Sequence, residues 1–202
     1  MTPYKTIIFD LSDTLLDFER NIGKDLASRL NEPLEIIYQS FENDYLYDYY
    51  LGRTTEDEYL NAIMKDWPSD IGLPEMKAII RRNLEIPMPG MPALLEALKP
   101  HYELALLSDH SIEWVDHILK KHPFLEIIER KFYSFDLGST KSEPATFRNV
   151  LKMLGREPEE CLFIDDQPHN CVIARSVGID AIRFVSLENL KQKLRERGIG
   201  DF

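Results

Sequence analysis

The sequence has few cysteines, few positive charges and no long apolar runs, and each shortage argues against a class of protein. Among 202 residues the only cysteines are Cys161 and Cys171, and neither belongs to a CxxC pair, so we expect a reduced, cytoplasmic setting. The 24 lysines and arginines are outnumbered by 35 aspartates and glutamates, which gives a net charge of −11. Phosphate-rich polymers and anionic lipids need a basic surface, so we expect no binding to nucleic acid or to membranes.

The apolar runs are also too short for a membrane span, which needs about 18 or more residues. The first run, within MTPYKTIIFD, ends in an acid, so no signal peptide is expected. The hydrophobic content of 44% is ordinary for a globular chain, and the length suits one core domain with a modest insert.

Several short apolar segments have the composition of buried strands and alternate with helical patterns. The predicted strands are residues 6–9, 103–107, 131–134, 161–164 and 180–185. Amphipathic segments separate the later ones, and glycines such as Gly155, Gly178 and Gly198 follow these segments, as is usual where helices end. This alternation predicts an α/β fold with a Rossmann-like parallel sheet covered by helices on both faces.

The first connection departs from this pattern. Connections in such folds usually have about 2–6 residues, but the chain after Asp10 continues through a long helical region before it returns to the sheet. Apolar residues recur at helical spacing, and Thr55 with Glu58 forms a predicted capping box. We therefore expect a helical module of four helices in residues 15–86, inserted after the first strand, and a core domain made of residues 1–14 and 87–202.

Polar side chains stand where the predicted strands end. Asp10 follows the first strand, and Ser108 and Asp109 follow the second. Lys141 comes after the third strand, at the start of a predicted helix, and Asp165 and Asp166 follow the fourth strand. The carboxyl ends of parallel strands share one edge, so these groups should meet there. Clustered carboxylates repel one another and attract a cation, and Mg²⁺ prefers oxygen ligands. The sequence therefore predicts a pocket for magnesium and phosphate, with Lys141 and the Ser108 hydroxyl as phosphate donors.

Four ordered motifs make the chain resemble the haloacid dehalogenase-like (HAD) superfamily, in its branch with a helical cap after the first strand. FDLSDT resembles the family's FDxDGT motif, LALLSD its strand ending in Ser or Thr, KSEP its lysine motif, and LFIDD its acidic pair. The stretch from DLGSTKSEP to LFIDDQPHN is similar to sugar-phosphate phosphatases of this branch.

The resemblance implies a covalent route of hydrolysis. Asp10 would attack phosphorus and become an aspartyl phosphate, which water then hydrolyses. Mg²⁺ would bind the Asp10 carboxylate, the backbone carbonyl of Ser12 and Asp166, with Asp165 in support. Ser108 and Lys141 would hold the phosphoryl oxygens, and Asp109 would lie beside them, where its charge would weaken phosphate binding. The implied partner is a small phosphorylated metabolite, and the chain would be a monomer or a homodimer.

Ser12 departs from the family pattern, because phosphatases of the family usually carry a second Asp at this position for proton transfer. A backbone carbonyl still binds a metal, so only the general acid–base contribution, about 10²–10⁴ in rate, is in question. Three interpretations stay open. The first is a phosphatase that tolerates the loss, either because its substrate has a better leaving group, such as an anomeric or acyl phosphate, or because Asp13 or His110 replaces the acid. The second is a phospho-ligand binder without turnover, and the third is a haloacid dehalogenase. The intact acidic pair argues against a dehalogenase, which needs no metal.

The helical module also contains a tyrosine-rich stretch, DYLYDYYLGR, at residues 44–53. Tyrosines at this density are typical of the inner face of a small helical bundle. A second hypothesis is that one of these tyrosines, or Arg53, reaches the pocket and binds sugar hydroxyls.

Overall fold

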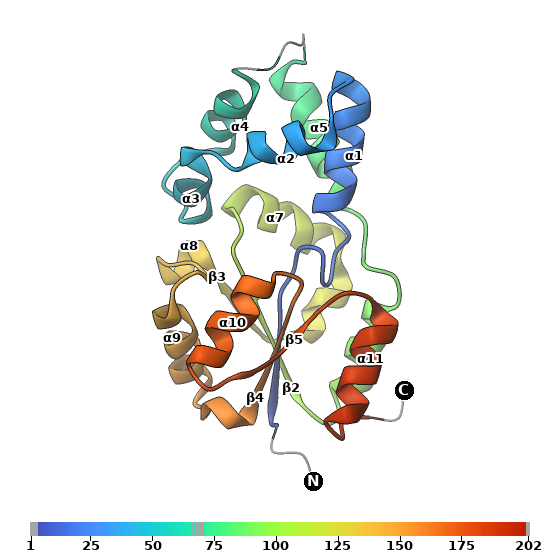
Figure 1. Cartoon of the computed structure of the whole chain (residues 1–202), viewed down its shortest axis with the longest axis vertical. Coiled ribbons are helices and arrows are strands. Elements are labelled where there is room, and N and C mark those ends of the chain that lie inside the picture. Colours follow the sequence, from blue (N-terminus) through green and yellow to red (C-terminus); the bar gives the residue numbers. More distant parts are fainter. Residues whose placement is uncertain (1–3, 66, 68–70, 201–202) are drawn as a thin grey trace.

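The computed structural model describes residues 4–65, 67 and 71–200, and its centre is a parallel β-sheet of five strands (Figure 1). The strand order is β3-β2-β1-β4-β5. The strands are β1 (Thr6–Phe9), β2 (Glu103–Ser108), β3 (Arg130–Tyr133), β4 (Cys161–Asp165) and β5 (Asp180–Arg183). All five predicted strands are confirmed: β1 has the predicted ends, and the ends of the other four differ from the expected ones by at most two residues.

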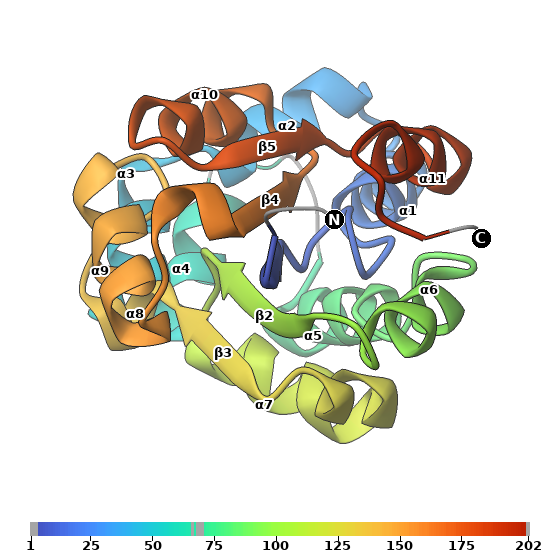
Figure 2. The same ribbon diagram turned by 90° about the horizontal axis from the view of Figure 1, so that it is seen from below.

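Helices cover both faces of the sheet, as Figure 2 shows. One face packs against α9 (Pro144–Leu154) and α10 (Pro168–Ser176), and the other against α6 (Met91–Leu98), α7 (Ile112–Lys121) and α11 (Leu187–Glu196). The three central strands, β2, β1 and β4, are almost wholly buried because apolar side chains point to both faces: Ile8 packs with the first group of helices, and Ile7 and Phe9 with the second. The predicted α/β fold with a Rossmann-like core is confirmed.

Five helices lie within residues 15–86 in the described part of the chain, where four were predicted. They are α1 (Glu19–Leu30), α2 (Leu34–Phe41), α3 (Asp44–Tyr50), α4 (Glu56–Met64) and α5 (Leu73–Asn83), and they form a separate layer beyond the carboxyl edge of the sheet (Figure 1). The additional helix arises at Asn43, whose side chain accepts the backbone N–H of Tyr45 and starts α3 apart from α2. The predicted capping box of Thr55 and Glu58 is confirmed at the start of α4.

Two short segments join the helical module to the core, and they are paired with each other. The backbone N–H of Asp17 donates to the carbonyl of Ile86 at 2.9 Å, and that of Met88 donates to Leu15 at 2.9 Å. The module therefore leaves and re-enters the core at one place, directly beyond Asp10.

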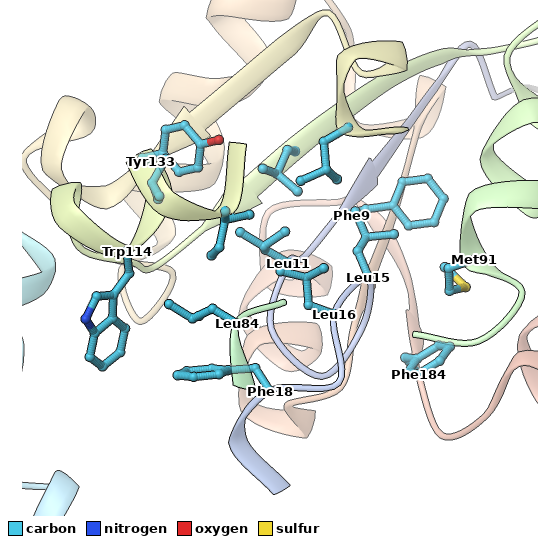
Figure 3. Packing of buried hydrophobic residues seen from close by; sticks show 14 of the residues in the cluster. Phe9, Leu11, Leu15, Leu16, Phe18, Leu84, Met91, Trp114, Tyr133 and Phe184 are labelled. Carbon is cyan, nitrogen blue, oxygen red and sulfur yellow. The ribbon is translucent and has the colours of Figure 1, made fainter. Parts of the chain in front are cut away.

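The larger hydrophobic cluster of the core continues into the module. Figure 3 shows Leu84 and Phe18 beneath Leu11 and Leu16, with the Trp114 ring nearby. Phe18 and Trp114 meet edge to face with ring centroids 5.5 Å apart. This packing places aromatic rings between the sheet edge and the helices of the module. None of the described helices has the length and the hydrophobicity needed to cross a membrane.

Candidate active site

The strand register brings the predicted site residues to one edge of the sheet. Phe9, the last residue of β1, pairs with Leu106 of β2 on one side and with Ile164 of β4 on the other. Asp10 therefore emerges between Ser108, which ends β2, and Asp165, which ends β4. This is the point where the strand order reverses, and ligands of open parallel sheets bind at such points.

Lys141 joins two of these carboxylates. Its Nζ atom donates to Oδ1 of Asp10 at 2.5 Å and to Oδ2 of Asp165 at 2.7 Å, and all three side chains are buried. Lys141 was expected at the start of a helix, but it lies in the turn between the short helix α8 (Ser134–Leu137) and α9. α9 begins only at Pro144, so Lys141 lies in the turn before it. From this turn its side chain reaches back to Asp10 and Asp165 at the sheet edge.

The site has more negative than positive charge. Burial raises the pKa of Asp10, although Lys141 opposes the shift, and burial together with the charge of Asp165 raises the pKa of Asp166 to about 6. Burial lowers the pKa of Lys141, but the carboxylates of Asp10, Asp165 and Asp109 outweigh it and hold that pKa well above its usual range. A cation beside the aspartates would relieve the repulsion between them.

The three acids are close enough to share such a cation, but they are not equally available. One carboxylate oxygen from each of Asp10, Asp165 and Asp166 lies within 4.8 Å of the others. Asp165 Oδ1 accepts the backbone N–H of Gln167 at 2.7 Å and the side-chain amide of Asn170 at 3.1 Å, while its Oδ2 accepts Lys141 and Asn170. Because its lone pairs are largely occupied, Asp165 positions its neighbours, and Asp10 and Asp166 are the better metal ligands.

Two buried hydroxyl groups beside the acids find no hydrogen-bond partner among the described residues. They are the Oγ of Ser108 and the Oγ1 of Thr14. A buried hydroxyl group without a partner costs about 1–3 kcal/mol. An anion bound at the sheet edge would supply the missing acceptor for Ser108, so the donor set fits phosphate as well as a metal ion.

The loop after Asp10 is a tight turn built around Asp13. Its φ is +53°, a left-handed conformation that Asp tolerates better than most residues, and its Oδ1 accepts the backbone N–H of Phe18 at 3.1 Å. Ser12 and Asp13 both line the cavity described below. Asp13 therefore organises the entry to the helical module while it lies beside the site.

Asp109 has a role that the sequence did not indicate. Both of its carboxylate oxygens accept the backbone N–H of Lys141, at 3.0 and 3.1 Å. Asp109 thus fixes the turn that carries the lysine, and burial raises the pKa of its carboxyl group. It also lines the cavity, and its predicted contact with bound phosphate stays a prediction.

His110 is poorly placed for proton transfer. It is buried between Phe18 and Trp114, and its Nδ1 accepts the backbone N–H of Ser111 at 3.1 Å. Burial lowers its pKa to about 3, so the ring is neutral near pH 7. His110 is not among the described residues that line the cavity, which argues against the predicted alternative of an acid–base role.

A cavity of about 520 Å³ lies between the sheet edge and the helical module. The core supplies a polar floor, formed by Asp10, Ser12, Asp13, Asp109, Lys141, Asp166, Gln167 and Asn170. The opposite side is mainly apolar and is formed by Phe18, Ile22, Tyr38, Phe41, Glu42, Leu46, Tyr50, Tyr59 and Trp114. This second group was not predicted, apart from the general expectation for the tyrosines.

The tyrosine-rich stretch divides between several environments. Tyr49 is completely buried and Tyr50 lines the cavity, but Tyr45 and Tyr47 are about half exposed, so an inner bundle face explains only part of the stretch. Arg53 is not among the described lining residues, and its guanidinium group lies 3.3 Å from Asp48 instead.

Contacts between the module and the core close the cavity. The Trp114 indole N–H donates to Oε1 of the buried Glu56 at 2.6 Å, and Arg81 binds the same carboxylate through two hydrogen bonds. Farther along, the Ser134 hydroxyl group donates to the backbone carbonyl of Tyr50 at 2.6 Å. The helical layer is therefore held against the sheet edge by polar contacts as well as by the aromatic cluster.

Comparisons with known proteins agree with this architecture. Residues 4–178 match the family of haloacid dehalogenase-like hydrolases. A chloroplastic flavin mononucleotide hydrolase from Arabidopsis thaliana is 25% identical over 194 residues, which cover 96% of this chain and 77% of the relative. A phosphoglycolate phosphatase from Aquifex aeolicus is 29% identical over 178 residues, which cover 80% and 76%.

Solved structures share the fold at lower identity. A HAD family enzyme from Bacteroides thetaiotaomicron, in complex with magnesium and inorganic phosphate, superposes with a TM-score of 0.72 at 21% identity and covers 93% of this chain and 98% of its own. The L-2-haloacid dehalogenase from Xanthobacter autotrophicus, with chloropropionic acid covalently bound, gives a TM-score of 0.70 at 18% identity and covers 98% and 85%. The same fold therefore accommodates both phosphate and halide chemistry, and the choice rests on the site.

Proposed function

This chain belongs to the haloacid dehalogenase-like hydrolases, and we propose that it is a magnesium-dependent phosphatase that hydrolyses a small phosphate monoester through Asp10. The observation that carries the proposal is the buried group of Asp10, Asp165 and Asp166 around a single lysine. Three carboxylates with one cation are suited to a further cation and to an anionic substrate, and a dehalogenase has no use for this excess of acid. The phosphatases among the similar proteins support the same choice.

Asp10, Asp166 and the backbone carbonyl of Ser12 would hold Mg²⁺, and Asp165 would support them. The donor set is all oxygen, as this ion prefers, and the mutual repulsion of the acids favours its entry. When bound, the ion would neutralise charge on the phosphoryl group.

The proposed reaction has two steps, both of which take place at Asp10. A carboxylate oxygen of Asp10 attacks phosphorus, and the bond from phosphorus to the ester oxygen breaks as that oxygen leaves and takes up a proton. Water then attacks phosphorus of the aspartyl phosphate, which releases inorganic phosphate and restores the Asp10 carboxylate. Lys141 has three N–H donors, of which two bind Asp10 and Asp165. The third donor and the unpartnered Ser108 hydroxyl group would bind phosphoryl oxygens.

We further propose that residues 15–86 act as a cap that encloses the substrate, while residues 1–14 and 87–202 form the catalytic core. The cavity between the two parts and the polar contacts that close it support this division. Closure of such a layer excludes water and strengthens the electrostatic interactions inside.

Because Ser12 stands where an acid is usual, we expect a lower rate of hydrolysis than with an acid at this position. Ser12 supplies no carboxylate, and burial keeps His110 neutral and away from the cavity lining, so the leaving oxygen receives little help from a general acid. Asp13 is the acid of the floor nearest to Ser12 in sequence and is the candidate that remains. The second function, a phospho-ligand binder without turnover, rests on this substitution alone.

The test is hydrolysis of p-nitrophenyl phosphate with Mg²⁺ and with EDTA, by the wild type, by Asp10→Asn and by the control Asp116→Asn. Asp116 is an exposed acid on α7. We expect turnover that needs Mg²⁺, survives Asp116→Asn and disappears in Asp10→Asn. Absence of turnover in the wild type, with Mg²⁺-dependent binding of inorganic phosphate by calorimetry, would favour the binder; neither turnover nor binding would reject both.

A further inference from the structure

The side of the cavity opposite the polar floor contains six aromatic residues: Phe18, Tyr38, Phe41, Tyr50, Tyr59 and Trp114. We call this set the aromatic wall. Resting on the proposed phosphatase function, we propose that the substrate is a phosphate monoester with a bulky aromatic leaving group that carries no second anionic group. A sugar phosphate or a phosphorylated carboxylic acid would then be a poor substrate.

The inner part of the wall is preformed. Phe18, Tyr59 and Trp114 are almost completely buried, and their rings contact one another or the neighbouring Tyr49. Tyr49 and Tyr59 stack with centroids 4.5 Å apart, and Tyr49 meets Trp114 edge to face at 5.4 Å. Rings that are already fixed lose little conformational entropy when another ring packs against them.

Two polar groups of the inner wall are directed away from a ligand. The Trp114 indole N–H donates to Glu56, and the Tyr59 hydroxyl group donates to the backbone carbonyl of Phe41 at 3.0 Å. Tyr59 has no exposed surface and Phe18 and Trp114 expose only a few per cent, so these three rings form a rigid apolar backing. The outer rings of Tyr38, Phe41 and Tyr50 are exposed or partly exposed and offer their surfaces to a ligand. The amides of the floor are engaged, since Gln167 binds Asp166 and Asn170 binds Asp165. A polyhydroxylated sugar needs several polar partners, and outside the polar floor the described lining adds only those of Tyr38, Glu42 and Tyr50.

The charge of the cavity argues against a second anionic group on the substrate. Among the described lining residues Lys141 is the only cation, and it belongs to the phosphoryl end of the site. The helical module adds one charged residue to the lining, the acid Glu42. A carboxylate or a second phosphate at that position would meet a like charge without a compensating cation.

The size of the cavity favours a large leaving group. About 520 Å³ is within the range of about 300–1,000 Å³ typical of pockets for drug-sized ligands. A leaving group of two or three carbons would leave the aromatic wall uncovered, with no apolar surface to bury against it.

The test compares esters whose leaving groups are all primary alcohols, so that their chemical reactivity is similar. 2-Naphthylmethyl phosphate is set against glycerol 3-phosphate and phosphoglycolate, with Mg²⁺ in each assay. We expect kcat/KM for the naphthyl ester to exceed the other two by at least about 10-fold. An equal or higher value for glycerol 3-phosphate or phosphoglycolate would overturn the inference.

A binding measurement separates this inference from the proposed function. Calorimetry with Mg²⁺ compares 2-naphthylmethylphosphonate with methylphosphonate, neither of which is hydrolysed. We expect the naphthyl compound to bind at least about 10-fold more tightly. If no ester is hydrolysed but this preference holds, the phosphatase proposal fails alone; if hydrolysis occurs and the two phosphonates bind equally, the aromatic inference fails alone.

Variants of the cavity lining test whether the preference for the naphthyl ester arises in the cavity. Phe41→Ala should lower the ratio of kcat/KM for the naphthyl ester to that for glycerol 3-phosphate, while the control Leu34→Ala, an exposed position on the same helix, should leave the ratio unchanged. Leu46 lines the cavity beside the aromatic wall, and Leu46→Arg adds a cation there, which should raise kcat/KM for phosphoglycolate relative to the naphthyl ester. Unchanged ratios in both Phe41→Ala and Leu46→Arg would overturn the assignment.

Discussion

The indole nitrogen of Trp114 lies 2.6 Å from Oε1 of Glu56, and this contact joins a core helix to the helical module. Glu56 is buried to within a few per cent of its surface, and Arg81 and Lys77 are its cationic partners. The tryptophan therefore contributes both a ring to the aromatic wall and a hydrogen bond that keeps the module closed.

Removing that hydrogen bond should loosen the closure. Trp114→Phe keeps a ring but loses the N–H, and because the partner is a buried carboxylate we expect the free energy of unfolding to fall by about 1.5–3 kcal/mol. Urea denaturation measures it. Trp67→Phe is the matched control, since the Trp67 N–H donates to the neutral Ser40 hydroxyl group at 2.9 Å and its loss should cost about 0.5–1.5 kcal/mol. A larger loss in the control would contradict a role for the Glu56 contact.

Lys141 is expected to serve catalysis and folding together. Lys141→Met removes the phosphoryl donor and should lower kcat by about 10²–10³. It also leaves Asp10 and Asp165 without their cation, which should cost about 3 kcal/mol of stability in EDTA. Because a divalent ion restores positive charge beside the same acids, Mg²⁺ should recover part of that loss, as a rise in Tm.

The exposed Lys152 on α9 gives the control, Lys152→Met, for which both readouts should stay near the wild type. A Tm of Lys141→Met that does not rise with Mg²⁺ would argue against a cation site between the acids.

The ends of the chain are joined at Asp180, which should make part of the stability depend on pH. Tyr4 donates to Asp180 at 2.6 Å, and Arg197 donates to both of its carboxylate oxygens. Burial raises the pKa of Asp180, but the hydrogen bonds from Arg197 and Tyr4 outweigh it, so the folded value lies below the ordinary one. A depressed pKa stabilises the fold above the unfolded value of about 3.9 and loses this contribution as the pH falls through the folded value.

Asp180→Asn should therefore lower the free energy of unfolding near pH 7 by about 1 kcal/mol or less, as expected for a partly exposed pair. Urea titrations from pH 7 to pH 3 should show this gap from the wild type narrowing below about pH 4. The control Asp116→Asn should show no such narrowing, and a gap for Asp180→Asn that widens in acid would refute the assigned sign.

Two glycines with left-handed backbone conformations allow the stability cost of backbone strain to be compared with the added cost of a steric collision. Gly90, at the start of α6, has φ +80°, and a Cβ atom there would collide with the Leu187 side chain. Gly138 has φ +67° and open space around the same position. Gly138→Ala should cost about 1–2 kcal/mol of stability for the backbone alone. Gly90→Ala should cost more in chemical denaturation, and equal losses would show that Leu187 moves aside freely.

The polar edge of the sheet could be predicted from the sequence because it depends on local rules. Asp10, Ser108 and Asp165 each follow an apolar strand, and parallel strands bring such positions together whatever lies between them. The lysine could be assigned from its motif, but its turn could not, because that turn is fixed by Asp109 from another strand end.

The apolar side of the site could not be predicted for a similar reason. Phe18, Phe41 and Trp114 have the same helical spacing as core residues, and only the docking of the module on α7 distinguishes a cavity wall from a core. Arg53 seemed a natural sugar ligand in the sequence, yet Asp48 lies close enough to pair with it outside the cavity. Specificity thus depends on contacts between elements that are distant along the chain, and a sequence pattern records these poorly.

The paired linkers at Leu15–Met88 and Asp17–Ile86 make the helical layer exchangeable. Its two ends lie side by side, so the core meets the same pair of linkers whatever length of chain lies between them. Recombination at this single seam can replace the module's share of the cavity lining in one event and leave Asp10, Trp114 and the polar floor untouched. Inherited chemistry and acquired selectivity can therefore evolve as separate units within one polypeptide.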